Sequence, residues 1–230
     1  MERKLFQSKL HSGEYLKYVY HKPDTQGKMP LLISLHGAGS RGDDLTPIET
    51  GWATVNAVKF VGDKAMIVAP QCHKKYWFDH FETLTEFIDE MRHLDCVDID
   101  RVYITGASMG GYTTWQMCLS HPDWFAAAVP VCGGGMYWAG AGLKNLPIWA
   151  THGALDTTVL PEETIHMVKA VNSNGGNAKI TIYADVKHDA WVPTYSDPEI
   201  WDWMFQQNRN PDKATASEVT EEMKAVIKEG

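Results

Sequence analysis

A serine between glycines is the residue whose setting most directly indicates chemistry. Residues 106–110 read Gly-Ala-Ser-Met-Gly, which is the G-x-S-x-G pattern, and they follow the apolar segment 102–104. A strand that turns straight into a helix holds its central serine in a strained conformation with the hydroxyl above the sheet edge, and glycines avoid clashes in so tight a turn. The pattern also occurs as a Gly-rich turn with a surface serine. The strand before it and the helix after it favour a nucleophile at Ser108.

A serine hydroxyl is a good nucleophile only when a base takes its proton, and the base needs an acid that orients it. Asp156 follows the apolar segment 148–150, and His188 follows the segment 178–183. Both residues therefore fall in loops beyond predicted strands. The sequence predicts Ser108 as nucleophile, Asp156 as acid and His188 as base, in that chain order.

Other residues compete for the roles of acid and base. His36 belongs to a different loop, and His152 comes at a strand end where it would support the turn. The other carboxylates that compete read as solvated loop groups or first-turn helix charges: Asp185, Asp189, Glu162 and Glu163. We therefore expect Asp156 to act as the acid and His188 as the base.

The oxyanion of an acyl-transfer intermediate needs two backbone N–H donors. Met109, directly after the serine, is expected to supply one. The loop 36–42, His-Gly-Ala-Gly-Ser-Arg-Gly, follows the apolar segment 31–35, and its glycines permit a close backbone approach. We expect the second donor to be Ala38, with Gly39 next. A phosphate-binding loop is disfavoured, because neither G-x-x-x-x-G-K-[ST] nor G-x-G-x-x-G occurs.

These residues must be positioned by a regular alternation of strands and helices. The apolar runs that predict buried strands are 31–35, 65–69, 102–104, 126–131, 148–150 and 178–183, after a hairpin candidate at 14–21. The predicted helices are 48–60, 84–94, 111–120, 162–171 and 198–205. Alternation of this kind predicts an α/β fold with a mostly parallel sheet and helices on both faces. Such sheets place their sites at the carboxyl ends of the strands.

Composition narrows the classes of partner. The chain has 230 residues, 44% apolar and 22% charged, with a net charge of −8 and no long basic run. We therefore expect neither nucleic acid nor a membrane surface as a partner. The N-terminus has no apolar segment of signal-peptide length, so we expect a cytoplasmic protein, or a secreted one if a leader has been removed.

The four cysteines, Cys72, Cys96, Cys118 and Cys132, stand far apart, which predicts buried free thiols. Cys72 and His73 form a pair of metal-ligand types, but nothing nearby completes a zinc set. We expect no metal and no cofactor.

The only boundary-like stretch is 208–212, so we expect one domain over residues 1–207. Residues 208–230 are predicted to form a linker and an amphipathic helix, since Val219, Met223, Val226 and Ile227 fall on one helical stripe. We expect this helix to pack on the domain, with a contact in a homodimer as the alternative.

From Leu31 to Phe205 the chain resembles serine carboxylesterases of the α/β-hydrolase superfamily. The segments that carry the resemblance read LHGAGSRG, VAPQC, GASMGGYTTW, AAAVPVCGGG, PIWATHGALD and VKHDAW. The similar groups are phospholipase/carboxylesterases, predicted peptidases and feruloyl-esterase-like proteins. The resemblance implies the triad and oxyanion donors named above, and it implies that Gln71 and Trp191 line or support the site. Dienelactone hydrolases carry cysteine at the position of Ser108, which argues against their chemistry here.

Only residues 132–147 separate two predicted strands at the usual place of a cap domain, which is too short for a lid. An open site suits short acyl groups, or acyl groups on large alcohols. The aromatic residues near strand ends are Tyr76, Trp77, Phe78, Tyr137, Trp138 and Trp191. At least half of such residues are expected to pack in the core; the others would stack on sugar or aryl rings. We expect Gly39, Gln71, Trp77, Trp138 and Trp191 to bind substrate.

The sequence therefore predicts a serine carboxylesterase for short-acyl or aryl esters, with feruloyl and acetyl esters of carbohydrates among them. A peptidase, lysophospholipase or thioesterase with the same triad is the alternative. A catalytically silent binding protein is disfavoured, because every part of the machinery is present.

Overall fold

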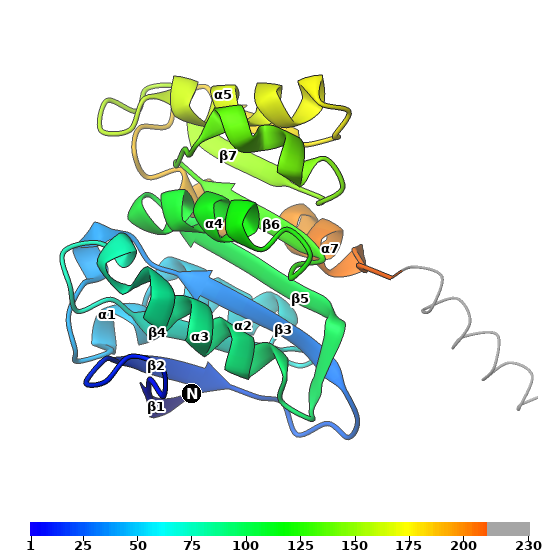
Figure 1. Cartoon of the computed structure of the whole chain (residues 1–230). Helices are drawn as coiled ribbons and strands as arrows, with labels where there is room; N and C mark the ends of the chain where they lie inside the picture. Colours follow the sequence, from blue (N-terminus) through cyan, green and yellow to red (C-terminus); the bar gives the residue numbers. More distant parts are fainter. Residues whose placement is uncertain (211–230) are drawn as a thin grey trace, which may run out of the picture.

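The structure is a computed structural model that describes residues 1–210. Its centre is an eight-stranded sheet in the order β1-β2-β4-β3-β5-β6-β7-β8 (Figure 1). The strands are β1 (Glu2–Gln7), β2 (Tyr15–His21), β3 (Met29–Leu35), β4 (Met66–Gln71), β5 (Val97–Ala107), β6 (Ala127–Val131), β7 (Trp149–Gly153) and β8 (Lys179–Tyr183). The predicted amphipathic helix lies outside the described residues, and the domain boundary at residue 207 stays a prediction.

Strands β3 to β8 pair in parallel, while β1 and β2 are antiparallel additions at one edge. The mostly parallel sheet predicted from the apolar runs is thus confirmed. The prediction of a hairpin within residues 14–21 is wrong, because this segment forms the single strand β2. The hairpin instead joins β1 to β2, and its turn includes Gly13 at φ +83°, a conformation that glycine adopts without strain.

The α-helices are α1 (Thr46–Glu49), α2 (Trp52–Val61), α3 (Phe81–Arg92), α4 (Met109–Ser120), α5 (Pro161–Ser173), α6 (Trp191–Ser196) and α7 (Pro198–Gln206). The predicted helix 48–60 is divided between α1 and α2. The division falls at Gly51, whose backbone is extended and where a Cβ would lie 2.8 Å from the carbonyl oxygen of Pro47. The short helix α6 was not predicted, because six residues are too few to show a helical period.

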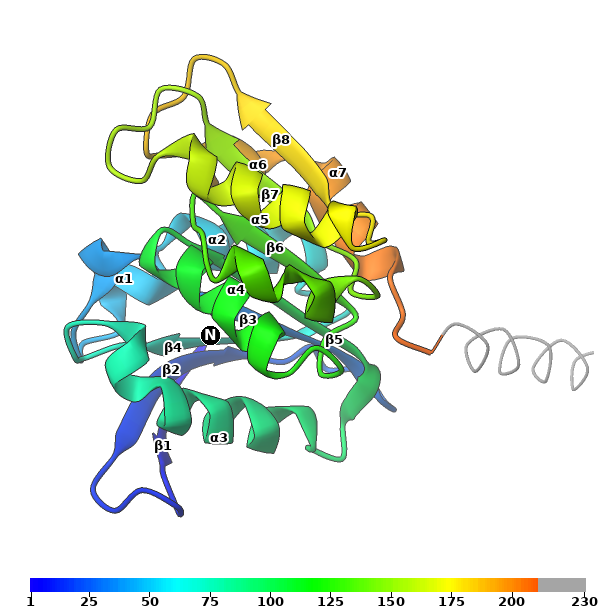
Figure 2. The ribbon, with the colours of Figure 1, turned by 45° about the horizontal axis from the view of Figure 1, so that its top comes forward.

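Helices cover both faces of the sheet and bury two cores (Figures 1 and 2). Helices α3, α4 and α5 lie on one face, where Phe87, Trp115 and Met167 are buried against the strands. Helices α2, α6 and α7 lie on the other face, with Tyr195 and Trp201 in the core. All four cysteines are free, as the sequence predicts, although Cys96 is only partly buried. Within the described residues, no helix is long and apolar enough to cross a membrane.

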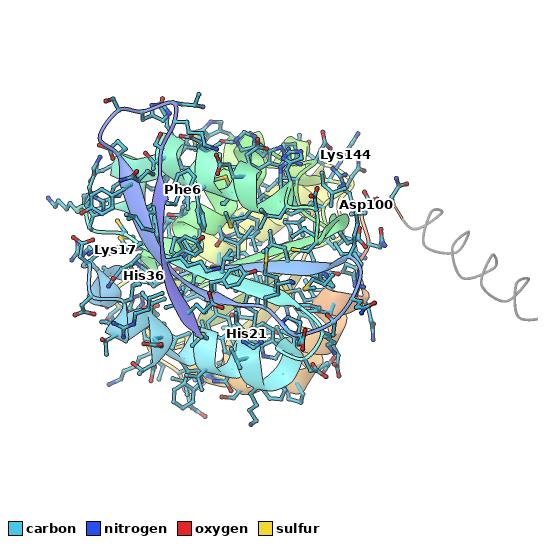
Figure 3. The ribbon with its side chains drawn as sticks, turned by 90° about the horizontal axis from the view of Figure 1, so that it is seen from below. Phe6, Lys17, His21, His36, Asp100 and Lys144 are labelled. Carbon is cyan, nitrogen blue, oxygen red and sulfur yellow. The ribbon has the colours of Figure 1, made fainter. Side chains whose placement is uncertain are left out.

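The parallel strands bring their carboxyl ends to one edge of the sheet. His36 follows β3 at this edge, and Figure 3 shows it at the opposite end of the molecule from Asp100, near the start of β5. Ser108 directly follows β5, and the loops with Asp156 and His188 follow β7 and β8. The fold therefore collects the predicted site residues at one edge.

Candidate active site

Ser108 lies in the tight turn between β5 and α4. Its φ of 55° and ψ of −115° are strained for a residue with a side chain. The turn closes because Gly106 and Gly110 have no side chain. A Cβ on Gly106 would lie 2.5 Å from the carbonyl oxygen of Gly110, and one on Gly110 would lie 2.1 Å from that of Leu35. The two glycines of the motif thus let α4 begin directly against the ends of β5 and β3.

Ser108, His188 and Asp156 form a continuous hydrogen-bonded chain. Ser108 Oγ lies 2.8 Å from His188 Nε2, and His188 Nδ1 lies 2.7 Å from Asp156 Oδ2. The carboxylate can only accept, so His188 donates from Nδ1 and keeps the lone pair of Nε2 for the serine hydroxyl. This tautomer is the one that a general base for Ser108 requires.

Asp156 is buried at the end of this chain. Its other oxygen, Oδ1, accepts hydrogen bonds from the backbone N–H groups of Thr158, at 2.9 Å, and Val159, at 3.0 Å. Burial by itself would raise the pKa of Asp156, but the hydrogen bonds from His188 and from these two amides outweigh it and lower the pKa. Asp156 therefore stays ionised and can stabilise an imidazolium at His188.

The residues that compete with Asp156 and His188 for the roles of acid and base lie in different surroundings. Asp185 and Asp189 are exposed, as expected for solvated loop carboxylates. His152 is fully buried, with Nδ1 2.7 Å from Thr164 Oγ1 and Nε2 2.9 Å from the carbonyl oxygen of Val159. His152 thus supports the loop of Asp156, as the sequence indicates, and does not contact Ser108.

The two expected oxyanion donors each begin a helix. Ala38 is the first residue of the 3-10 helix η1 (Ala38–Ser40), and Met109 is the first residue of α4. The first N–H groups of a helix have no partner within it, so both amides are available to a ligand. A Cβ on Gly37 would lie 3.5 Å from Ser108 Cβ, which shows that the loop of Ala38 lies against the serine.

The side chain of His36 holds the start of the loop that carries Ala38. Its Nε2 accepts a hydrogen bond from the backbone N–H of Cys72 at 2.9 Å, and its Nδ1 lies 2.6 Å from the carbonyl oxygen of Gly37. Burial lowers the pKa of His36 to about 4, so the ring is neutral and donates from Nδ1. His36 is therefore a support for the loop, and not a second base.

Gln71 and Trp77 hold the same loop from behind. Gln71 donates from Nε2 to the carbonyl oxygen of Ser40 and accepts from the N–H of Leu45. Trp77 donates from Nε1 to the carbonyl oxygen of His36 at 3.0 Å. Both side chains are buried and neither lines a cavity beside Ser108 or Ala38, so the expectation that Gln71 and Trp77 bind substrate is corrected: they support the loop. The sequence around Trp77, with aromatic residues on both sides, does not indicate which of the three side chains is buried.

A cavity of about 430 Å³ opens beside the serine and the base. Gly39 and Trp191 are among its lining residues, and the Trp191 ring meets the His188 ring edge-on with centroids 5.5 Å apart. Trp52 also lines it and was not predicted, because it lies in a helical stretch with no motif. Trp138 is 73% exposed and is not among the lining residues of this cavity, so its expected role finds no support here.

A second cavity of about 390 Å³ borders the loop 36–42, here called the oxyanion loop, at Ala38. Its lining residues are Ala38, Tyr76, Phe78, Met109 and Tyr112. Tyr76 and Phe78 come from the segment at the 3-10 helix η2 (Trp77–His80), and Tyr112 lies one turn into α4. Ala38 thus lines both cavities, whereas Met109 lines the second one.

Cys132, Asp156 and His188 are the one group of metal-ligand side chains that comes together in the described residues, with ligand atoms within 4.8 Å of one another. Asp156 and His188 already share a hydrogen bond. Burial raises the pKa of Cys132 to about 12, so its sulfur is a neutral thiol. A metal ion would have to break the hydrogen bond and deprotonate the thiol, and the cluster is better explained as part of the serine site.

Comparison with known proteins identifies hydrolases. Residues 71–139, which include Ser108, match the model of the prolyl oligopeptidase family. Poly(3-hydroxyalkanoate) depolymerase C of Paucimonas lemoignei is 30% identical over 122 residues, which cover 46% of this chain and 28% of that protein. The bifunctional acetylxylan esterase/xylanase XynS20E of Neocallimastix patriciarum is 27% identical over 146 residues, which cover 60% of this chain and 21% of that protein. The chain thus spans about a quarter of the length of these relatives.

The crystal structure of a thermostable esterase is similar over most of the chain. The two have 30% sequence identity and a TM-score of 0.76, and the match covers 90% of this chain and 63% of the esterase.

Proposed function

Because the chain belongs to the α/β-hydrolase superfamily, we propose that it hydrolyses carboxylic esters, with Ser108 as the nucleophile. The observation that carries the proposal is the continuous chain of hydrogen bonds from Ser108 through His188 to Asp156. The available N–H groups of Ala38 and Met109 beside it support the same reaction. Nucleophile, base, acid and oxyanion donors all lie at one edge of the sheet.

The reaction follows from these positions. His188 Nε2 takes the Ser108 proton as Oγ attacks the ester carbon, and the carbonyl oxygen becomes an oxyanion held by the two backbone N–H groups. The imidazolium at His188, stabilised by Asp156, then gives its proton to the leaving alkoxide. Water repeats the cycle on the acyl-enzyme and releases the carboxylic acid. The proposal needs no cofactor.

The substrates that we propose are short-acyl or aryl esters, with feruloyl and acetyl esters of carbohydrates among them. Between β6 and β7 the chain forms only the 3-10 helix η3 (Tyr137–Leu143), which supports an open site without a large cap. Two of the relatives are named as a poly(3-hydroxyalkanoate) depolymerase and a bifunctional acetylxylan esterase/xylanase, which is compatible with acyl groups on large alcohols. A small-molecule or carbohydrate ester is therefore the proposed partner.

A peptidase is the second candidate, and one observation favours it. The segment with Ser108 matches the prolyl oligopeptidase family, whose name denotes peptide hydrolysis. The triad geometry suits amides and esters alike, so only the rates on the two substrate types separate these candidates.

The proposed nucleophile can be tested by covalent labelling. A p-nitrophenyl phosphonate should attach to Ser108 alone, as mapped by mass spectrometry, and Ser108→Ala should remove both the label and roughly 10⁴-fold or more of kcat on p-nitrophenyl acetate. Ser173→Ala, at an exposed position of α5, is the matched control and should keep label and activity. Label on another residue would overturn the proposal. Peptide p-nitroanilides cleaved as fast as esters would favour the peptidase.

A further inference from the structure

Two cavities meet at Ala38, and Ser108 lines the larger of them. The cavity of about 430 Å³ is lined by His188, together with Trp52 and Trp191. The cavity of about 390 Å³ is lined by both donor residues, Ala38 and Met109, and not by His188. The ester carbon must sit between them, within reach of Ser108 Oγ.

The chemistry assigns one side to the alcohol. His188 must protonate the leaving oxygen, so this oxygen and the group it carries lie on the side of His188 Nε2. The carbonyl oxygen points at the N–H groups of Ala38 and Met109. Of the substituents on the ester carbon, only the acyl group is left. The side away from His188 is open to it, because the second cavity borders Ala38 and Met109 there.

The second cavity has the lining of a site for an aromatic group. Its exposed surface is apolar, and three of its five residues are aromatic: Tyr76, Phe78 and Tyr112. Burial, followed by the nearby carboxylate of Glu163, raises the pKa of Tyr112 to about 12, so the phenol is neutral. An uncharged cavity with several ring faces and edges favours a flat aromatic group over a sugar or a charged group.

Two of these aromatic side chains are exposed on a segment that is held firmly. Tyr76 is 47% exposed and Phe78 is 52% exposed, on either side of the fully buried Trp77. Trp77 donates to the carbonyl oxygen of His36. Arg41 links the same two segments, because it donates to the carbonyl oxygens of Ala38, at 2.9 Å, and Lys75, at 2.7 Å.

These bonds fix the aromatic pair relative to the oxyanion loop. Exposed aromatic rings on a mobile loop would need to be ordered when a ligand binds, whereas rings on a braced segment are already in place. The bracing therefore adds a reason, beyond the lining itself, to connect Tyr76 and Phe78 with substrate.

We propose that the cavity of Tyr76, Phe78 and Tyr112 is the acyl site, that it selects an arylacyl group of the hydroxycinnamoyl type, and that the alcohol lies between Trp52 and Trp191. This inference rests on the proposed ester hydrolysis, and it assigns the selectivity for the acid part of the ester to residues that the triad does not include.

The test varies the acyl group at a constant alcohol, with p-nitrophenyl acetate, hexanoate and cinnamate as substrates of the full chain. The wild type should prefer cinnamate to hexanoate in kcat/KM. Phe78→Ala and Tyr76→Ala should each lower kcat/KM for cinnamate about tenfold and change that for acetate by no more than about twofold. Leu5→Ala, at a 54% exposed apolar residue on β1, is the control and should change neither.

A second series varies the alcohol at a constant acetyl group. Trp52→Ala should lower kcat/KM for p-nitrophenyl acetate relative to methyl acetate, while Phe78→Ala should affect the two equally. Three results would overturn the acyl-site assignment. One is the reverse pattern for the two alcohols, and another is an equal loss of kcat/KM on acetate and cinnamate in Phe78→Ala. The third is a wild type with equal kcat/KM on hexanoate and cinnamate. A wild type without turnover of any ester would overturn the proposed function itself.

Discussion

His188 Nδ1 lies 2.7 Å from Asp156 Oδ2, although 32 positions separate the two residues in the sequence. They meet because each follows one of two neighbouring parallel strands, β7 and β8, whose carboxyl ends lie at the same edge. The distance makes Asp156 the carboxylate that sets the tautomer of His188, a role that Asp189 cannot take from its exposed position.

Asp156→Asn should therefore lower kcat by about 10⁴-fold, because an amide in place of the carboxylate favours the wrong tautomer of His188 and cannot stabilise its cation. Asp189→Asn is the matched control and should stay within about twofold of the wild type. The measurement is kcat on p-nitrophenyl acetate for both variants. A larger loss in Asp189→Asn would reassign the acid.

Trp77→Phe should lower kcat about tenfold with little change in KM. The variant keeps most of the buried ring but removes the Nε1–H that holds the carbonyl oxygen of His36, so the N–H of Ala38 would be less well aimed at the oxyanion. Trp115→Phe is a matched control, because Trp115 is equally buried and its Nε1 has no hydrogen-bond partner in the described residues. Equal effects of both variants on kcat would mean that only packing is lost.

Gly110→Ala should destabilise the fold by about 2–3 kcal/mol, a fall in Tm of about 5–10 °C, since the new Cβ forces the start of α4 away from β3. That Cβ would lie 2.1 Å from the carbonyl oxygen of Leu35. Gly142→Ala is the control, because no atom lies within 4 Å of a Cβ there. Thermal unfolding of the two variants should show a large shift only for Gly110→Ala.

The stability of the protein should fall as the pH drops from about 6.5 towards 4, in part because of His80. This side chain is fully buried in η2, where its Nδ1 lies 3.3 Å from Glu14 Oε2 and its Nε2 has no hydrogen-bond partner in the described residues. Burial lowers the pKa of His80 to about 4, and the adjacent His73 and Lys74 act in the same direction, against the carboxylate of Glu14. The folded state therefore favours neutral His80, while the unfolded chain takes up a proton below about pH 6.5.

The contribution of His80 is thus complete above about pH 6.5 and decreases as the pH falls toward 4. Between pH 7.5 and 5 it should remove about 2 kcal/mol from the free energy of unfolding. Urea unfolding at the two pH values should show this loss in the wild type and in the exposed-site control His166→Leu, and a smaller one in His80→Leu. An unchanged pH dependence in His80→Leu would show that His80 does not cause it.

The sequence by itself determined the parallel strands of the sheet and the places of Ser108, Asp156 and His188 at its edge. Apolar runs such as 31–35 and 126–131, which alternate with predicted helices, indicate buried strands of a covered parallel sheet, and parallel strands end at one edge. Residues that directly follow those runs must therefore gather there. The glycines around Ser108 also predicted the sharp turn, because a turn this tight requires residues without a side chain at these positions.

The tertiary structure alone decided which side chains near Ser108, Asp156 and His188 face a cavity. Trp77 and Phe78 are neighbours in sequence, yet Trp77 is fully buried and Phe78 is 52% exposed beside a cavity. Trp52 reaches the site from a helix that no motif marks, and Gly51 divides that helix from α1. In short 3-10 turns and loops there is no repeating period, so the direction of a side chain depends on the distant segments that pack against it.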